Sequence, residues 1–187
     1  MITSQEDTIL KNNTKKLVLG ALLAALTTAA TLVIRIPSPG TNGYINPGDT
    51  IVLLSAWVLG GWYGAAAAGI GSSLADIFGG YTHYAPGTFV IKSIMAFAAY
   101  MVFKRSRRFS IPQTIRYILS GIAAETIMML GYLLYEYFFL GYGPAAFVSM
   151  AGNAFQGAAN IILAILLASA LAKTKLPGIM TYGDHTT

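Results

Sequence analysis

The 187-residue chain contains no cysteine and only two histidines, and charged residues make up just 10% of it. Without cysteine, the chain can form no disulfide, thiol nucleophile or thiolate metal site. So few charges, beside 55% hydrophobic residues, exclude a soluble globular domain. The net charge of +5 does not indicate a nucleic-acid partner, because the Lys and Arg residues cluster between apolar runs. The composition predicts an integral membrane protein, and the length allows one domain.

Apolar blocks follow one another along the chain, and each can be compared with the ~20 residues that a membrane-spanning helix needs. They are residues 17–34, 50–62, 63–78, 87–103, 114–140 and 153–172. The second and third are short and could form one long helix kinked at Gly60-Gly61, so the count is five or six. The polar segments 1–13 and 175–187 are expected to be flexible tails around a transmembrane domain at 14–174.

The positions of the basic residues decide between five and six helices, because cytoplasmic loops carry an excess of Lys and Arg. They cluster before the first block, after the fourth and after the last: Lys11, Lys15 and Lys16; Lys104, Arg105, Arg107 and Arg108; Lys173 and Lys175. Six helices place all three clusters on one side, whereas five would place the second cluster opposite the N-terminus. We therefore predict an all-α membrane protein, a six-helix transmembrane bundle with both termini cytoplasmic.

Asp76 and Lys92 carry charge inside apolar blocks, and an ionisable side chain at membrane depth is by default a functional-site hypothesis. In the six-helix orientation Asp76 lies in the outer part of the third helix. Lys92 lies about 7 Å below the outer end of the fourth helix, at ~1.5 Å per residue, and so at a similar depth. The two residues either neutralise one another as a buried structural pair or line a ligand site, and pairing does not exclude the second role.

Further polar residues gather in the outer half of the last two blocks. Glu125 falls near the middle of the fifth helix, where it could cap a polar helix contact, and Glu136 falls near the outer end, where we expect it to be solvated. Asn153, Gln156 and Asn160 share nearly one face of the sixth helix, as binding groups or as interhelical hydrogen bonds. The inner half has almost no polar residues, which predicts a pocket closed from the cytoplasm and not a pore.

Two outer loops can cover that pocket. Residues 35–49 are rich in proline, glycine and asparagine, which indicates an ordered turn or a lid. The second loop, 79–86, contains Tyr81, His83 and Tyr84. Their rings either anchor the chain at the membrane interface or stack on a flat heterocycle, with Asp49 or His83 supplying hydrogen bonds.

Four segments of the chain resemble a known family. They are G-Y-I-N-P-G-D at 43–49, the double-glycine run 57–63, residues 69–80 with Ser72, Ser73 and Asp76, and H-Y-A-P-G-T-F-V-I-K at 83–92. They resemble the S component, the substrate-binding membrane subunit, of energy-coupling factor (ECF) vitamin transporters. The resemblance is closest to the riboflavin-type group, which includes pyridoxine-, hydroxymethylpyrimidine- and cobalamin-type members. It extends across all six predicted helices and is specific within 43–99.

The resemblance implies a protein of the prokaryotic plasma membrane that captures a scarce vitamin in its outer half. It implies association with a coupling transmembrane subunit and two cytoplasmic ATPases, and no enzymatic activity or cofactor of its own. The chain lacks a G-x-x-x-x-G-K-[ST] loop, so ATP would be used by the partner subunits. The family's small-residue motif falls on Ala21 and Ala25, which we expect to dock on the coupling subunit. The expected substrate-binding residues are Tyr44, Asn46, Asp49, Asp76, Tyr81, His83, Tyr84, Lys92, Asn153 and Gln156.

Two other classes of protein can be weighed against this one. A secondary transporter would use Asp76, Glu125 and Lys92 as an ion or proton relay, and it predicts inverted repeats, yet the two halves of the chain show no evident similarity. An enzyme would need a nucleophile with a base, or a metal cluster, and the only histidines are His83 in a loop and His185 in the tail. We therefore expect neither catalytic nor metal-binding residues.

Only the chemistry of the expected pocket limits the range of possible substrates. One acid, one amine and several tyrosines suit a pyridine or pyrimidine ring with hydroxymethyl groups. Riboflavin and cobalamin also fit, since the conformation of the loops sets the volume of the pocket.

Overall fold

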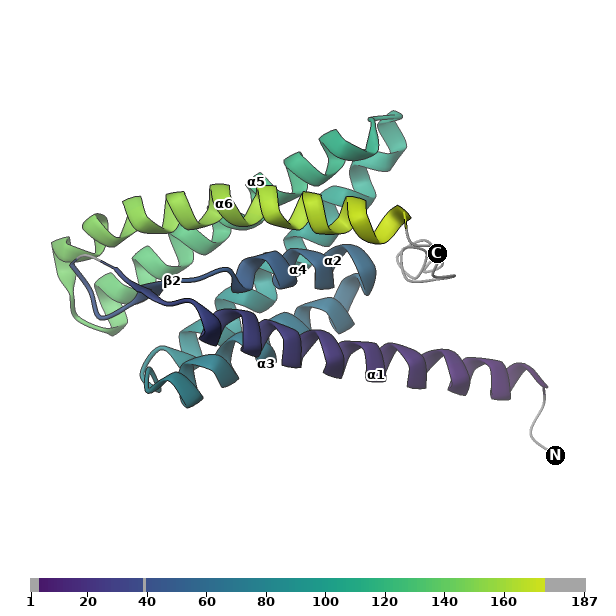
Figure 1. Ribbon diagram of the computed structural model, residues 1–187, viewed down its shortest axis with the longest axis horizontal. Helices are drawn as coiled ribbons and strands as arrows, with labels where there is room; N and C mark the ends of the chain where they lie inside the picture. The colour runs from purple at the N-terminus through teal and green to yellow at the C-terminus, as the bar shows by residue number, and fades with distance from the viewer. Residues whose placement is uncertain (1–3, 39, 174–187) are drawn as a thin grey trace.

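The computed structural model describes residues 4–38 and 40–173 of the chain, which form a helical bundle (Figure 1). Its α-helices are α1 (Ser4–Val33), α2 (Gly48–Val58), α3 (Gly61–Gly79), α4 (Ala85–Ser106), α5 (Gln113–Leu134) and α6 (Ala146–Lys173). Two short antiparallel strands, β1 (Ile36–Pro37) and β2 (Tyr44–Ile45), fold the loop between α1 and α2 back on itself. Single helical turns η1 (Arg107–Phe109), η2 (Tyr135–Phe139) and η3 (Gly143–Ala145) lie at the ends of α4 to α6.

Four helical segments of the described chain are long and apolar enough to cross a membrane: Asn12–Val33, Ala85–Phe109, Gln113–Phe139 and Gly143–Lys173. Helix α3 has 19 residues, and α2 has only 11. At ~1.5 Å per residue, α2 is about 16 Å long, roughly half of the ~30 Å hydrocarbon core. The fold is thus the predicted helical bundle, whereas six complete crossings stay a prediction.

Helices α2 and α3 are separate elements joined by a tight turn, so the alternative of one kinked helix is wrong. Gly60 and Gly61 take positive φ values of 63° and 45°, which favour glycine and end the helix there. After this turn α3 runs back beside α2 (Figure 1). A Cβ atom at Gly64 would lie 2.5 Å from the carbonyl oxygen of Ser55, so the two helices touch at their backbones.

The centre of the bundle is the short helix α2, which packs against α1, α3, α4 and α6. After Asp49 its residues are apolar apart from Thr50 and Ser55, and all but Ile51 are buried, as expected for a helix in the core. Val52, Leu53 and Trp57 meet Met95 of α4 and Met128 of α5 in the main core. This core lies below the α1–α2 loop and supports the polar residues at the start of α2.

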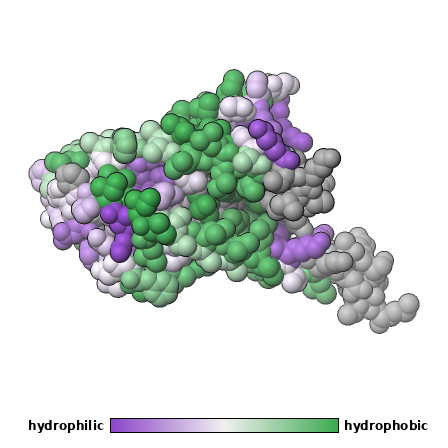
Figure 2. All heavy atoms as spheres, viewed as in Figure 1, coloured by the Kyte–Doolittle hydropathy of each residue, from purple (hydrophilic) through white to green (hydrophobic). Residues whose placement is uncertain are grey.

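The beginning of α1 and the end of α6 lie at the same end of the bundle. In Figure 1 they lie toward the right with the α2–α3 and α4–α5 turns, whereas the α1–α2, α3–α4 and α5–α6 connections lie toward the left. Hydrophobic residues dominate the middle of the visible surface, and hydrophilic residues gather toward both ends (Figure 2). This is the arrangement that the predicted orientation requires, while the side of the membrane on which each end lies stays a prediction.

Several helix ends differ from the predicted ones. Helix α1 already begins at Ser4, inside the segment predicted as an N-terminal tail, and α6 begins at Ala146, seven residues before the predicted start. Helix α5 continues into the π-helical turn η2. The predicted tail at 175–187 lies outside the described residues.

Candidate binding site

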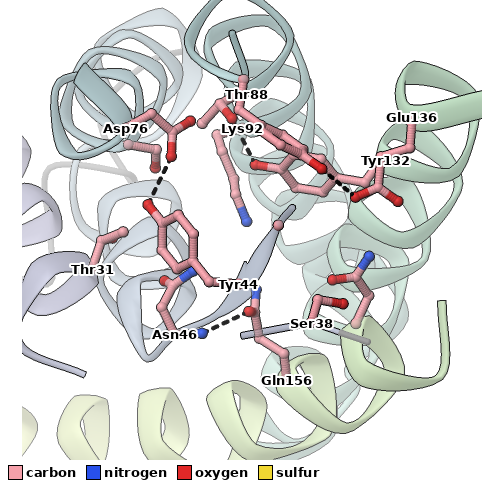
Figure 3. A pocket seen from close by; sticks show the side chains of 14 residues that line it. Thr31, Ser38, Tyr44, Asn46, Asp76, Thr88, Lys92, Tyr132, Glu136 and Gln156 are labelled. Atoms are coloured by element: carbon pink, nitrogen blue, oxygen red, sulfur yellow. Dashed lines mark hydrogen bonds between the residues drawn. The ribbon is translucent and has the colours of Figure 1, made fainter. Parts of the chain in front are cut away.

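A polar pocket lies beneath the α1–α2 loop, between the loop ends of α3, α4, α5 and α6 (Figure 3). It is lined by Thr31, Ser38, Gly43, Tyr44, Asn46, Ser72, Asp76, Tyr84, Thr88, Lys92, Tyr132, Glu136, Asn153 and Gln156. The cavity volume is about 30 Å³, well below the roughly 300 to 1,000 Å³ of small-molecule sites. A ligand of vitamin size therefore fits only when the lining residues move apart.

The floor of the pocket is an ion pair between two helices. Lys92 of α4 donates from Nζ to Oδ1 of Asp49, in the first turn of α2, and both side chains are almost fully buried. Gln156 of α6 donates to the second oxygen, Oδ2, of Asp49 at 2.6 Å. Because both carboxylate oxygens have partners, this buried charge is well compensated. The Lys92 ammonium also lies 5.3 Å from the centre of the Tyr132 ring.

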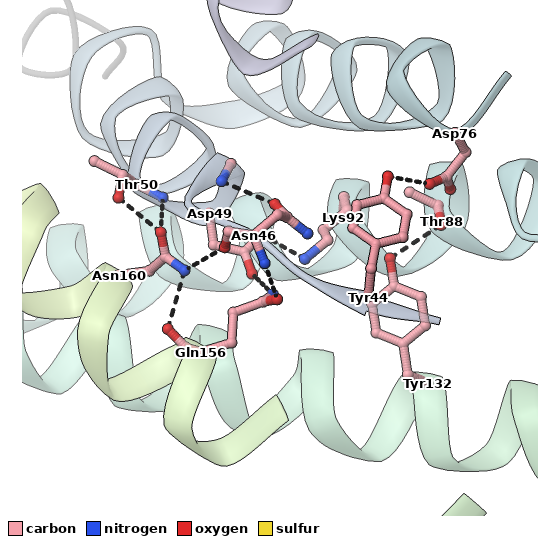
Figure 4. A network of polar contacts seen from close by, with 11 residues as sticks. Tyr44, Asn46, Asp49, Thr50, Asp76, Thr88, Lys92, Tyr132, Gln156 and Asn160 are labelled. Carbon is pink, nitrogen blue, oxygen red and sulfur yellow. Dashed lines mark hydrogen bonds and ion pairs between the residues drawn. The ribbon is translucent and has the colours of Figure 1, made fainter. Parts of the chain in front are cut away.

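Two amides of α6 hold the end of the covering loop (Figure 4). Gln156 Oε1 accepts the backbone N–H of Asn46 at 2.8 Å. Asn160 Nδ2 donates to the carbonyl of Asn46 at 2.9 Å, and its Oδ1 accepts the N–H and hydroxyl of Thr50. These bonds engage backbone groups before and within the first turn of α2, where helical N–H groups lack partners inside the helix. The predicted polar face of α6 is thus buried and ties the loop to the pocket.

Asp76 does not form an ion pair with Lys92, so the alternative of a structural pair between these two residues is wrong. Its Oδ1 instead accepts a 2.7 Å hydrogen bond from the hydroxyl of Tyr44 in β2. Burial raises the pKa of the Tyr44 phenol and the Asp76 carboxylate adds to the shift, so the hydroxyl keeps its proton and acts as the donor. The Tyr44 side chain joins the covering loop to α3.

Glu136 is buried and lines the pocket, so the expectation that it is solvated is wrong. It lies in the π-helical turn η2, a distortion that often accompanies functional sites. Its Oε1 accepts the hydroxyl of Tyr84 at 3.0 Å, and its Oε2 accepts the hydroxyl of Ser149. One turn earlier, the hydroxyl of Tyr132 is hydrogen-bonded to Thr88 at 3.0 Å.

The structure brings together most of the residues expected to bind substrate. Those that line the pocket are Tyr44, Asn46, Asp76, Tyr84, Lys92, Asn153 and Gln156. Asp49 lies behind Lys92 as its ion-pair partner. Tyr81 packs on Tyr44, with ring centres 4.5 Å apart, and His83 is exposed; neither lines the pocket.

Sequence reasoning missed half of the lining: Thr31, Ser38, Gly43, Ser72, Thr88, Tyr132 and Glu136. Tyr132 and Glu136 are four residues apart on a helix and so share a face. This spacing could have identified them as pocket residues from the sequence. Small hydroxyl residues such as Thr31 and Ser38 leave no signal, because they occur widely in helices and loops.

Glu125 lies on α5 outside this pocket. Its carboxylate is buried and, among the described residues, neither oxygen has a hydrogen-bond partner, so the alternative that it caps a polar helix contact is wrong. It packs against Gly157 of α6, where an added Cβ would lie 2.9 Å from the Glu125 Cβ. The described chain also contains no group of three or more acidic or histidine side chains placed to hold a metal.

Ala21 and Ala25 lie on the exposed face of α1, away from the neighbouring residues Leu23 and Ala24 that pack into the bundle. This face is open to the surroundings of the protein. Packing within the bundle therefore does not account for these two small residues.

The fold and the apolar helices define a helical membrane protein with an enclosed polar pocket near one end. A family model described as "ECF-type riboflavin transporter, S component" matches residues 11–173. The chain therefore belongs to this family of transporter S components, as the sequence motifs predicted.

Solved structures share the fold. The S component for biotin from an ECF-type ABC transporter superposes with a TM-score of 0.69 at 17% identity, covering 97% of this chain and 99% of that one. The S component of a bacterial ECF transporter gives 0.66 at 20% identity, covering 88% and 99%. A protein of Pyrococcus woesei, described as an uncharacterized protein in gap 3'region, is 34% identical over 118 residues, which are 63% of this chain and 76% of that protein.

Proposed function

We propose that the chain captures a small water-soluble vitamin in the pocket beneath the α1–α2 loop and delivers it to a partner ATPase module. The observation that carries this proposal is the pocket itself: a polar site enclosed by apolar helices, with the buried Lys92–Asp49 pair as its floor. A placed charge and a few hydrogen-bonding groups inside an otherwise apolar protein are typical of small-molecule sites.

The best-fitting substrate is a pyridoxine- or hydroxymethylpyrimidine-like heterocycle. Three tyrosine rings, from Tyr44, Tyr84 and Tyr132, line the pocket and offer aromatic faces to a flat ring. Asn153 and Gln156 can hydrogen-bond to ring nitrogens or hydroxymethyl groups. Riboflavin and cobalamin would need a much larger displacement of the covering loop, given the small volume of the closed pocket.

The proposal includes six membrane crossings, cytoplasmic termini and a place in a prokaryotic plasma membrane. In this arrangement the pocket opens outward, and the exposed Ala21 and Ala25 of α1 dock on a coupling transmembrane subunit. Two ATPase subunits supply the energy from ATP, and the chain binds no cofactor and catalyses no reaction itself.

Mass spectrometry of the vitamin that co-purifies with the full chain tests this function, followed by calorimetric titration with a vitamin panel. We expect one member to bind with a dissociation constant in the micromolar range or below. Failure of every vitamin to bind at that level would remove the basis for the proposal.

An uptake assay separates this function from secondary transport. Cells that express the chain with a coupling subunit and both ATPases should accumulate the vitamin. Uptake should be lost when the ATPases carry a substitution of their P-loop lysine. Uptake that persists with inactive ATPases would instead support a stand-alone transporter.

A further inference from the structure

The charges of the pocket do not balance. Three ionisable carboxylate or ammonium groups line it: Asp76, Glu136 and Lys92. The single cation, Lys92, is already paired with Asp49, which lies behind the lining. Within residues 4–38 and 40–173, no ion pair reaches Asp76 or Glu136, and their hydrogen-bond donors are neutral hydroxyl groups.

One buried carboxylate oxygen in the pocket lining lacks a hydrogen-bond donor among the described residues. Asp76 is 4% exposed, its Oδ1 accepts the Tyr44 hydroxyl, and its Oδ2 has no hydrogen bond among the described residues. Ser38 Oγ, which is buried and lines the other side of the pocket, is likewise unbonded among the described residues. A buried acceptor without a donor is costly, and native structures usually satisfy such groups with a ligand, an ion or water.

The two carboxylates that have no ion-pair partner lie on opposite sides of the pocket. In Figure 3 Asp76 lies on one side, near Thr88, and Glu136 lies on the other, beside Tyr132. Arg35, in the α1–α2 loop, does not supply a cation to the pocket lining. Its side chain donates to the carbonyl of Gly79 instead. The site therefore combines excess negative charge with three tyrosine rings, a surrounding that favours cations. Two of these rings already have a cation of the protein near them: Arg35 lies 5.9 Å from the centre of the Tyr44 ring, and Lys92 lies 5.3 Å from that of Tyr132.

We propose that the pocket selects a small aromatic ligand that carries a protonated nitrogen, which donates to Asp76 Oδ2, and rejects ligands that carry a carboxylate. This inference rests on the proposed function and adds the charge of the substrate to it. A carboxylate placed between Asp76 and Glu136 would meet two like charges in a buried site, whereas an amine would supply the missing donor and the missing positive charge.

The test compares two probes with the same ring and opposite charge. Pyridoxamine carries a protonated aminomethyl group where 4-pyridoxic acid carries a carboxylate. Both are titrated calorimetrically into the purified full chain at pH 7.5, alongside cationic thiamine, neutral riboflavin, and the carboxylates biotin and nicotinate. We expect a cationic member of the panel to bind at least about tenfold more tightly than any carboxylate, the lower range of a buried charge-assisted hydrogen bond.

The outcomes distinguish failure of the charge preference from failure of the proposed vitamin binding. If a carboxylate or a neutral vitamin binds most tightly, the charge inference is wrong while the proposed function stands. If no panel member binds, the proposed function fails and the inference fails with it.

Substitutions then assign the effect to the two carboxylates. Asp76→Asn keeps the shape and an oxygen that can accept from Tyr44, and Glu136→Gln does the same for Tyr84. Each should weaken binding of the cationic probe roughly tenfold to a hundredfold and reduce its preference over the acid. Glu125→Gln is the matched control, a buried carboxylate outside the pocket lining, and should retain the preference. Unchanged binding of the cation by folded Asp76→Asn and Glu136→Gln proteins would overturn the inference.

Discussion

The hydroxyl of Tyr44 donates a hydrogen bond to Oδ1 of Asp76, and Tyr81 packs on the same ring without such a bond. Tyr44→Phe would leave Oδ1 of this buried carboxylate without its donor. We expect it to lower the stability of the protein by about 1 to 3 kcal/mol, the cost of an unsatisfied buried group. Thermal unfolding in detergent measures the change, with Tyr81→Phe as the control that should leave the midpoint unchanged. Equal effects of the two substitutions would contradict the role assigned to Tyr44.

The Lys92–Asp49 pair makes a different prediction, because removal of one member leaves a buried charge uncompensated. Lys92→Met should destabilise the protein by roughly 3 to 5 kcal/mol. Adding Asp49→Asn to this variant removes the unpaired buried charge and should recover part of the lost stability. In both variants residue 49 keeps an oxygen that can accept the hydrogen bond from Gln156. A double-mutant cycle of thermal or denaturant unfolding gives the coupling energy. Additive effects of the two substitutions would show that the ion pair does not stabilise the fold.

For individual residues, the sequence shows which side chains are unusual in their surroundings, but it does not show which residues they contact. A charge inside an apolar block, as at Asp76 and Lys92, stands out from its neighbours and indicates a site. The partner of Lys92 lies 43 residues away on another helix. Two acids, Asp49 and Asp76, were available to it, and only the packing of α2 against α4 decides between them.

Among the helices, close contact between α2 and α3 depends on Gly64. An added Cβ there would lie 2.5 Å from the Ser55 carbonyl oxygen, while at Gly20 of α1 it would meet only Leu59 Cδ1 at 3.8 Å. Alanine favours a helix over glycine by about 1 kcal/mol at both positions. We expect the backbone clash to outweigh this gain for Gly64→Ala, with a net loss of about 1 to 3 kcal/mol. Gly20→Ala should be neutral or stabilising.

The same unfolding measurement on both glycine variants tests this comparison. A Gly64→Ala protein as stable as Gly20→Ala would mean that α2 and α3 can separate without cost. Such a result would also weaken the argument that the α2 position is fixed beneath the pocket.

The helices themselves follow from the sequence, because long apolar runs between Gly, Pro and basic turns leave few other choices. Gly60-Gly61 ends α2, and Pro112 precedes α5. What could not be predicted is the π-helical turn at Tyr135–Phe139, which depends on tertiary contacts and leaves no pattern in the sequence. That turn is where Glu136 lies, which explains why a residue near the predicted membrane interface is buried in the pocket.

For the whole molecule, the central position of α2 connects the fold to the proposed capture of a ligand. Its first turn supplies Asp49 to the pocket floor, and the rest of the helix is held in the core by α1, α3, α4 and α6. The floor is therefore held by packing against four helices, whereas the covering loop is attached to α6 through Asn46 and to α3 through Tyr44. Opening of the closed pocket should occur by movement of the loop and not of the floor.

The orientation of the bundle can be tested directly because the chain contains no cysteine. Asn42→Cys places a thiol on the exposed covering loop, and Ser110→Cys places one on the exposed turn after Lys104–Arg108 at the opposite end. With basic turns facing the cytoplasm, a membrane-impermeant maleimide added to intact cells should label Asn42→Cys and not Ser110→Cys. Permeabilised cells provide the control, since both thiols should then react. Labelling of Ser110→Cys in intact cells would reverse the topology and would place the pocket, and the proposed capture of vitamin, on the wrong side of the membrane.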